Sequence, residues 1–121
     1  MAEAIAKSLD AGKALRIESA GISAKPGSPA TAEAIQAMKQ MGIDLLSHCA
    51  RHVTRVRLDD FDVIIAMCPS VALQLRGLFP HTASRIIAWN VDDPFGQGQA
   101  VYDSAAQQIK HLVIQLIANE R

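Results

Sequence analysis

The sequence predicts one α/β domain over residues 1–121, with a three-layer α/β/α arrangement around a parallel sheet. Helix-like and strand-like patterns alternate along the chain, which is typical of this class. The near-continuous apolar run at 62–67 indicates a strand covered on both faces, as in a parallel sheet between helices. A length of 121 residues with 50% hydrophobic content suffices for one core, and 12 acidic against 12 basic residues disfavour nucleic acid as the main partner.

The chain opens with a predicted helix followed by a predicted strand. Repeated alanines favour a helix that runs from the first residues to Leu9. Ile5 and Leu9 give this helix an apolar edge, and Gly12 ends it. At 15–19, apolar and polar residues alternate, which is the pattern of a half-covered strand.

A second helix is predicted over 30–41, after a loop that includes Lys25-Pro26. Ser28 offers a hydroxyl that can cap the helix, and Pro29 fits the first helical turn. Gly42 marks the end of the helix, because glycine adopts the left-handed conformation that follows many helices.

The second half of the chain continues the alternation of helices and strands. After an irregular stretch and the strand at 62–67, a helix is predicted from Pro69 to about Leu78 and a strand over 85–89. A loop at 92–96 leads to a last helix over 100–118. Its apolar residues recur at helical spacing and form one stripe: Ile109, Leu112, Val113, Leu116 and Ile117.

A series of motifs resembles, in the same order and over essentially the whole chain, the low-molecular-weight protein tyrosine phosphatases. They are Met1-Ala2-Glu3-Ala4, Arg16-Ile17-Glu18-Ser19-Ala20-Gly21, Gly42-Ile43-Asp44-Leu45, Ser47-His48-Cys49-Ala50-Arg51, Asp62-Val63-Ile64-Ile65-Ala66-Met67 and Asp93-Pro94-Phe95-Gly96. Each motif is weak by itself, whereas the complete ordered set is specific. The Asp-Pro-Phe-Gly loop resembles that of the bacterial members.

The resemblance implies a cysteine-dependent phosphomonoesterase that acts on phosphorylated proteins or small phosphoesters without a cofactor. Such chemistry needs a thiolate, N–H donors and an arginine for the phosphate oxygens, and an acid for the leaving oxygen. In the family, a Cys-x5-Arg-Ser-Pro loop directly precedes Met-Ala-Glu-Ala, so the nucleophile is expected ahead of Met1. Residues 1–121 alone are therefore expected to be inactive. Two alternatives stay open, a catalytically dead binding or regulatory homologue and an arsenate-reductase-like member.

The resemblance also assigns roles to residues of this chain. Asp93, directly before Pro94, is the expected general acid, and Asp92 is the neighbouring candidate. Ser19 and His48 correspond to positions that hydrogen-bond around the phosphate-binding loop, and Phe95 is expected to line the substrate cleft.

The remaining candidates are cysteines and histidines, and neither group forms a complete site. Cys49 and Arg55 have Cys-x5-Arg spacing, but no glycine lies between them and no strand precedes them, so the match is taken as coincidence. Cys68 lies where the related arsenate reductases carry a resolving cysteine, but no second cysteine follows, which favours a small buried apolar role. The i, i+4 pair His48 and His52 has no third ligand, so no metal site is expected.

The first strand of the family fold, which lies between 15–19 and 63–67, is also expected to lie ahead of Met1. In its absence, we expect one of three outcomes. These two segments pair directly with each other, the chain self-associates through exposed strand edges, or the chain stays a marginally stable monomer. The sequence shows neither a signal peptide nor a membrane-spanning stretch, and two unpaired cysteines suit a reducing cytoplasm.

Overall fold

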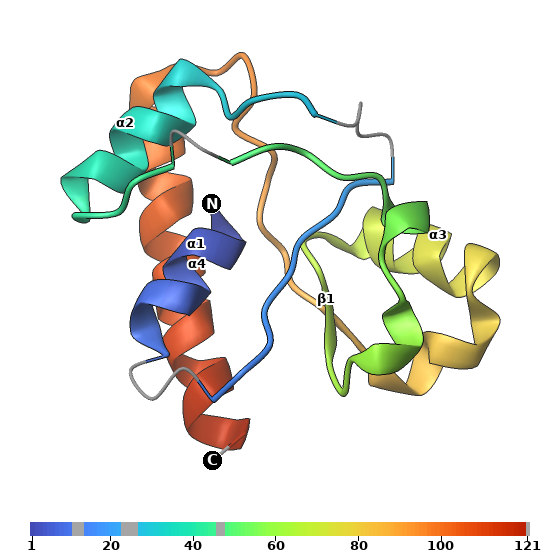
Figure 1. Cartoon of the computed structure of the whole chain (residues 1–121). Helices are drawn as coiled ribbons and strands as arrows, with labels where there is room; N and C mark the ends of the chain where they lie inside the picture. Colours follow the sequence, from blue (N-terminus) through green and yellow to red (C-terminus); the bar gives the residue numbers. More distant parts are fainter. Residues whose placement is uncertain (11–13, 23–26, 46–47, 121) are drawn as a thin grey trace.

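The computed structural model describes residues 1–10, 14–22, 27–45 and 48–120 (Figure 1). In chain order, its elements are α1 (Ala2–Leu9), α2 (Ala32–Gln40), β1 (Ile64–Ala66), α3 (Pro69–Leu78), β2 (Ile86–Ala88) and α4 (Gln99–Glu120). Short 3₁₀ turns, η1 (Val53–Arg55), η2 (Leu58–Asp60) and η3 (Pro80–Arg85), connect them. The predicted Gly12 stop, the Lys25-Pro26 loop and Ser47 lie outside the described residues.

The strands β1 and β2 form a parallel pair, as predicted. Ile64 pairs with Ile86 and Ala66 with Ala88, and α3 connects the two strands. The pairing continues past β2, because the Trp89 N–H donates to the Ala66 carbonyl at 2.8 Å. The two strands therefore end side by side, and the residues that follow each of them emerge at the same edge of the sheet.

The predicted strand at 15–19 is wrong, because this segment forms no strand and Figure 1 draws it as coil. Within the described residues, regular backbone pairing here begins only at Gly21, whose N–H donates to the Arg51 carbonyl at 2.9 Å. A strand exists only where a neighbour supplies a ladder of hydrogen bonds, and alternation of side chains cannot supply that neighbour. The expected direct pairing with 63–67 is likewise not formed, because β1 pairs with β2.

The second helix begins two residues later than predicted. Thr31, not Ser28, is its N-cap, and the Thr31 hydroxyl accepts from the Ala34 N–H at 3.2 Å. The Ser28 carbonyl instead accepts from the Ala50 N–H at 2.7 Å, which holds 28–29 in a bridge with 49–50. Gly42 ends the helix as predicted, with φ of 75°, a conformation that residues with a Cβ avoid.

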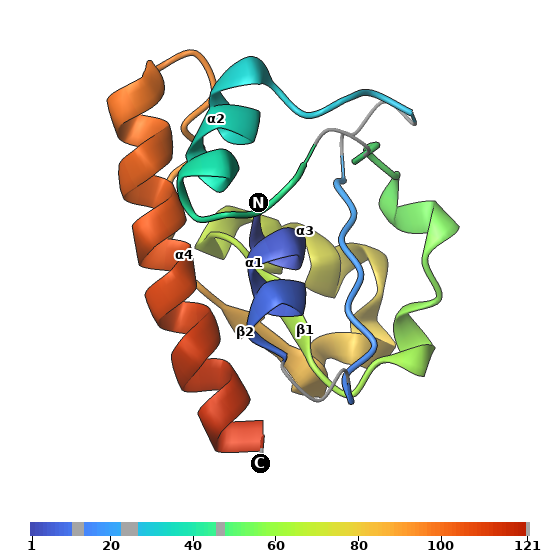
Figure 2. The ribbon, with the colours of Figure 1, turned by 60° about the vertical axis from the view of Figure 1, so that its left-hand side comes forward.

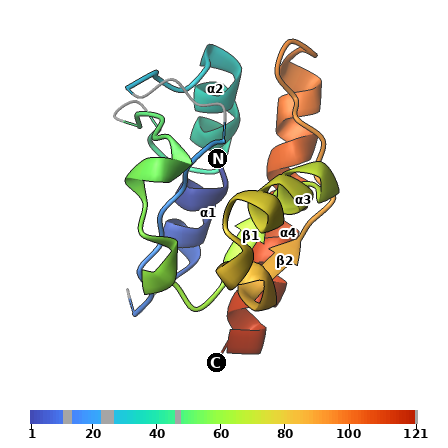
Figure 3. The same cartoon turned by 90° about the vertical axis from the view of Figure 1, so that its right-hand side faces the viewer.

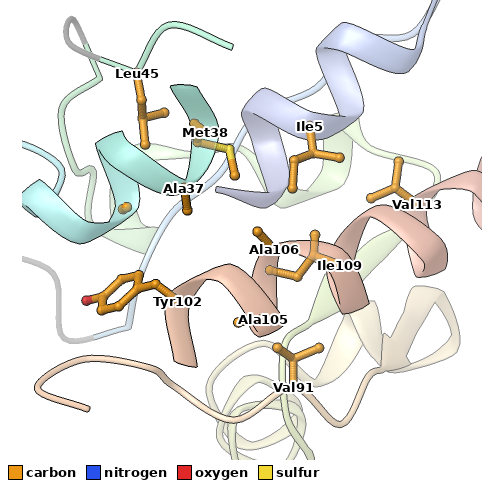
Figure 4. Packing of buried hydrophobic residues seen from close by; sticks show 11 residues of the cluster. Ile5, Ala37, Met38, Leu45, Val91, Tyr102, Ala105, Ala106, Ile109 and Val113 are labelled. Carbon is orange, nitrogen blue, oxygen red and sulfur yellow. The ribbon is translucent and has the colours of Figure 1, made fainter. Parts of the chain in front are cut away.

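The main core lies where α1 and α2 pack against α4, and Figure 4 shows its side chains pointing toward one another. Ile5 is 1% exposed and Met38 is fully buried. From α4, the core receives part of the predicted stripe, because Ile109 and Val113 are buried. Trp89, at the end of β2, packs against the same cluster. Burying such side chains is the principal driving force that holds the three helices together.

A second core lies between α3 and the sheet. Ala72 and Leu75 of α3 are buried against Ile64 and Ile86 of the two strands. Figures 2 and 3 show α3 and α4 in different views, and together with Figure 1 they place the strands between α3 and the layer of α1, α2 and α4. The α/β class and the parallel sheet are thus confirmed. No helix in the described ranges is long and apolar enough to cross a membrane.

Candidate active site

A surface cavity of about 330 Å³ opens where the loop after β2 meets the first residues of α1 and α2. The resemblance assigns roles to three of the lining residues, Asp93, Phe95 and His48. Met1 lines the cavity at the start of α1, Thr31 at the start of α2 and Tyr102 in the first turns of α4, the last seen in Figure 4. His48 and Asp93, 45 positions apart in sequence, thus share one concave surface, the usual form of a small-molecule site.

Asp93 follows β2 at the carboxyl end of the sheet. Its Oδ1 accepts a hydrogen bond from the Phe95 N–H at 3.0 Å, which forms a tight turn through Pro94. The Gln97 side-chain amide donates to the Asp93 carbonyl at 2.7 Å and closes the same turn from the other side. The Asp93 side chain is exposed, and its carboxylate is therefore available to a ligand in the cavity.

His48 and Phe95 face the cavity from different elements. His48 is half-buried in the segment that leads to η1. Phe95 lies in the Asp93 loop and is 71% exposed, an unusual state for a phenyl ring in the free protein. An exposed aromatic ring at the rim of a cavity can cover the apolar part of a bound molecule.

Ser19 is not among the residues that line this cavity. Its hydroxyl donates to Glu3 Oε1 at 2.6 Å, and its carbonyl accepts from Arg51 Nη2 at 3.3 Å. Arg51 also pairs with Glu18 at 2.8 Å, so a polar network joins the first turn of α1 to the segments at 18–19 and 51. The structure thus brings three of the four predicted site residues to the cavity and places Ser19 in the network behind α1.

Glu3 is the residue that anchors this network to α1. Burial raises the pKa of its carboxyl, but hydrogen bonds from Lys7 and Ser19 together with the nearby charges of Lys7 and His48 outweigh burial and hold the pKa below its usual value. The ionised carboxylate is therefore the form that the fold stabilises.

Neither cysteine lines the cavity. Cys49 is exposed, and the 50–55 segment that follows it runs into η1 and does not wrap around a helix N-terminus, so the Cys-x5-Arg spacing to Arg55 forms no phosphate cradle. Cys68 is half-buried at the N-cap of α3. A hydrogen bond with the Ser70 hydroxyl, helped by the Val71 N–H, lowers the pKa of the Cys68 thiol.

Among the residues that the structure describes, no group of three His, Cys, Asp or Glu side chains could hold a metal ion. His52 instead accepts from the Thr54 N–H at 3.2 Å and caps η1.

The sequence did not predict Thr31 or Gln97 as parts of this region. Thr31 has a recognisable signal, a capping residue just before an amphipathic helix. The contact of Gln97 with Asp93 has no such signal, because a glutamine between two glycines is typical of any surface loop.

The chain matches the family model described as low molecular weight phosphotyrosine protein phosphatase over residues 1–120. It is 32% identical to a glutaredoxin arsenate reductase of Synechocystis sp. over 98% of this chain and 86% of that protein. It is 30% identical to the low molecular weight protein-tyrosine-phosphatase Ptp of Acinetobacter johnsonii over 82% of this chain and 74% of that protein.

Solved structures agree with these sequence relatives. The low molecular weight protein tyrosine phosphatase from T. tengcongensis superposes with a TM-score of 0.86 at 32% identity, covering 98% of this chain and 88% of that one. The YwlE arginine phosphatase with a phosphorylated active-site serine gives 0.90 at 25% identity, covering 98% and 84%. This chain belongs to the low molecular weight phosphotyrosine protein phosphatase family.

Proposed function

We propose that this chain contributes the general acid and the substrate cleft of a cysteine-dependent phosphomonoesterase. One observation carries the proposal: Asp93, His48, Phe95 and the start of α1 border the same cavity. The first N–H groups of a helix have no partner within the helix and can bind phosphate oxygens, and the positive end of the helix dipole favours an anion there.

In the proposed reaction, a cysteine thiolate carried ahead of α1 attacks phosphorus and the ester oxygen leaves. Asp93 donates a proton to that oxygen and, as a carboxylate, then activates the water that hydrolyses the phosphocysteine. Phe95 covers the organic part of the substrate, while His48 and, through Glu3, Ser19 hold the surrounding backbone in place.

The test uses the chain extended ahead of Met1 by a Cys-x5-Arg-Ser-Pro segment. Asp93→Asn should lower kcat by about 10²–10⁴-fold for alkyl phosphates, whose leaving oxygen is basic, and much less for activated aryl phosphates. Asp92→Asn is the matched control, because it removes the neighbouring exposed carboxylate and leaves the Asp93 turn intact. Equal losses of kcat on alkyl and aryl phosphates would show that Asp93 is not the general acid. Tight phosphopeptide binding without any turnover would favour a binding or regulatory homologue.

Arsenate reduction is the second candidate function, and Cys68 is the observation that favours it. Its thiol has a lowered pKa at the carboxyl end of β1, and one relative is a glutaredoxin arsenate reductase. Reduction of arsenate to arsenite takes two electrons, which two thiols supply as they form a disulfide. The extended chain with glutathione and glutaredoxin should release arsenite in a Cys68-dependent way under this hypothesis, and a Cys68→Ser chain with undiminished arsenite release would refute it.

The family acts on phosphorylated proteins or phosphoesters, and we propose the same substrate class here. We further propose that residues 1–121 form a single domain, that the protein works in the cytoplasm, and that neither nucleic acid nor a membrane is a partner. The balanced charge and the two free cysteines support these proposals.

A further inference from the structure

We propose that Gln97 is a positioning residue that holds the Asp93 carboxylate in its working orientation. This inference rests on the proposed role of Asp93 as general acid. The Gln97 Nε2 donates to the Asp93 carbonyl oxygen at 2.7 Å, and the Gln97 backbone N–H donates to the Pro94 carbonyl at 3.0 Å.

Both of these bonds hold the backbone of the loop, at the carbonyls of Asp93 and Pro94, and neither contacts the Asp93 carboxylate. Asp93 Oδ1 accepts from the Phe95 N–H at 3.0 Å, so the direction of the carboxylate depends on the backbone between these two residues. Gln97 fixes that backbone at the Asp93 carbonyl. The turn is therefore held from both ends, at its side chain by Phe95 and at its carbonyl by Gln97.

Two glycines make this contact geometrically possible. Gly96 and Gly98 have φ of 76° and 94°, in the left-handed region that favours glycine. The reversal of the chain at these two points brings the Gln97 side chain back over Asp93. No Cβ at either glycine would meet another atom within 4 Å, so the requirement for glycine is conformational.

Packing cannot perform this positioning, because the loop is open to solvent. Asp93, Phe95 and Gln97 are all exposed, and none belongs to either core cluster. In a loop without buried apolar contacts, side-chain to backbone hydrogen bonds determine which conformation is populated. The Gln97 amide is the side-chain donor that contacts the Asp93 backbone among the described residues.

The experiment follows the Phe95 amide in the 121-residue chain by NMR during an acid titration. Protonation of Asp93 weakens the bond from the Phe95 N–H and shifts its signal, and Asp93→Asn provides the baseline without that shift. Asp92 and His48 are the other ionisable side chains near this loop, so an Asp92→Asn background and the ring signals of His48 separate their contributions.

Gln97→Met keeps the shape of the side chain and removes the donor. Loss of one hydrogen bond should lower the ratio of the closed to the open turn about fivefold and so reduce the amplitude of the Phe95 shift. Gln97→Lys retains a donor and should restore most of the amplitude. Gln108→Met is the matched control, because Gln108 makes the same kind of bond, at 3.0 Å, to the Asn90 carbonyl in an exposed site.

Full amplitude in Gln97→Met, or no Asp93-dependent shift in the parent chain, would overturn the positioning role. The NMR measurement does not depend on enzymatic turnover, so it tests the positioning role separately from the proposed function. If the Asp93→Asn kinetics fail while the Phe95 shift depends on Gln97, the proposed function is wrong and the positioning is right.

Discussion

At the scale of single residues, Asp93, His48 and Phe95 border one cavity although they come from two distant segments of the chain. They could be named as candidates because they lie in family motifs. The Ser28 cap could not be decided locally, since Ser28 and Thr31 both offer a hydroxyl at a helix start. The bridge between 28–29 and 49–50 made the choice, and contacts 20 and 22 positions away in sequence are invisible to a local rule.

Thr31→Ala should destabilise the protein by about 1 kcal/mol, because the N–H of Ala34 loses its partner at the start of α2. Urea denaturation measures the loss. Ser28→Ala is the control and should change stability by much less, since the Ser28 hydroxyl does not cap the helix. Equal losses in the two variants would contradict the assignment of Thr31 as the cap.

Glu3 should make the stability of the fold sensitive to acid. Its folded pKa lies below the ordinary value of 4.5, so its contribution is fully present above pH 4.5 and is lost as the pH falls through the folded pKa. Glu3→Gln should therefore make the urea midpoint fall less steeply as the pH is lowered from neutral. Glu33→Gln, in the first turn of α2, is the matched carboxylate control, and an effect as large as that of Glu3→Gln would contradict the role of Glu3.

At the scale of elements, helices were predicted more accurately than strands. The patterns of α3 and α4 gave bounds within a few residues, because a helix satisfies its backbone internally. The alternation at 15–19 predicted a strand that did not form, because a strand depends on a neighbour elsewhere in the chain. The 3₁₀ turns between 53 and 60 had no periodic signal, and Arg85 holds one of them in place from a distance of 24–27 residues.

Arg85→Ala should destabilise the protein by about 1.5–3 kcal/mol, because three backbone carbonyls lose a charged donor. These are the carbonyls of Leu58, Asp59 and Phe61, at 3.4, 3.3 and 3.0 Å from Nη1. Arg85→Lys should recover only part of the loss, because one ammonium cannot contact these carbonyls and also reach Asp59 Oδ1, to which Nη2 donates at 3.3 Å.

Thermal unfolding compares these variants with Arg76→Ala, which removes an exposed arginine of α3. That control should lie within about 0.5 kcal/mol of the parent. A loss in Arg85→Ala no larger than in the control would show that η2 folds without this clamp.

At the scale of the whole molecule, the α/β class followed from the order of patterns, whereas the extent of the sheet did not. The sheet has two strands within the described residues, and β1 pairs only with β2 there. In the described part of the chain, neither the segment at 15–20 nor the second edge of β1 has a strand partner, so both can take part in further backbone pairing. The hydrophobic pattern of a strand does not encode which segment becomes its neighbour, so the pattern could not predict the extent of the sheet.

Residues 1–121 alone should self-associate reversibly through these edges, as sedimentation velocity over a range of concentrations would detect. Leu15→Lys should weaken the association, because a charged side chain beside an open edge opposes pairing with another chain. Leu73→Lys removes a more exposed apolar side chain, at 72%, from α3 and should have no effect. A monomer at every concentration, or equal effects of the two lysines, would contradict association through the edges.

Trp89 gives the molecule a built-in optical reporter. It is the one tryptophan in the sequence, and it is half-buried where β2 ends, between the main core and the loop that leads to Asp93. Its indole should emit at shorter wavelength when packed against the helices than when exposed to water. Fluorescence without any added dye therefore follows the unfolding of every variant above, and it reports on the packing of the main core at the point where the chain leaves β2.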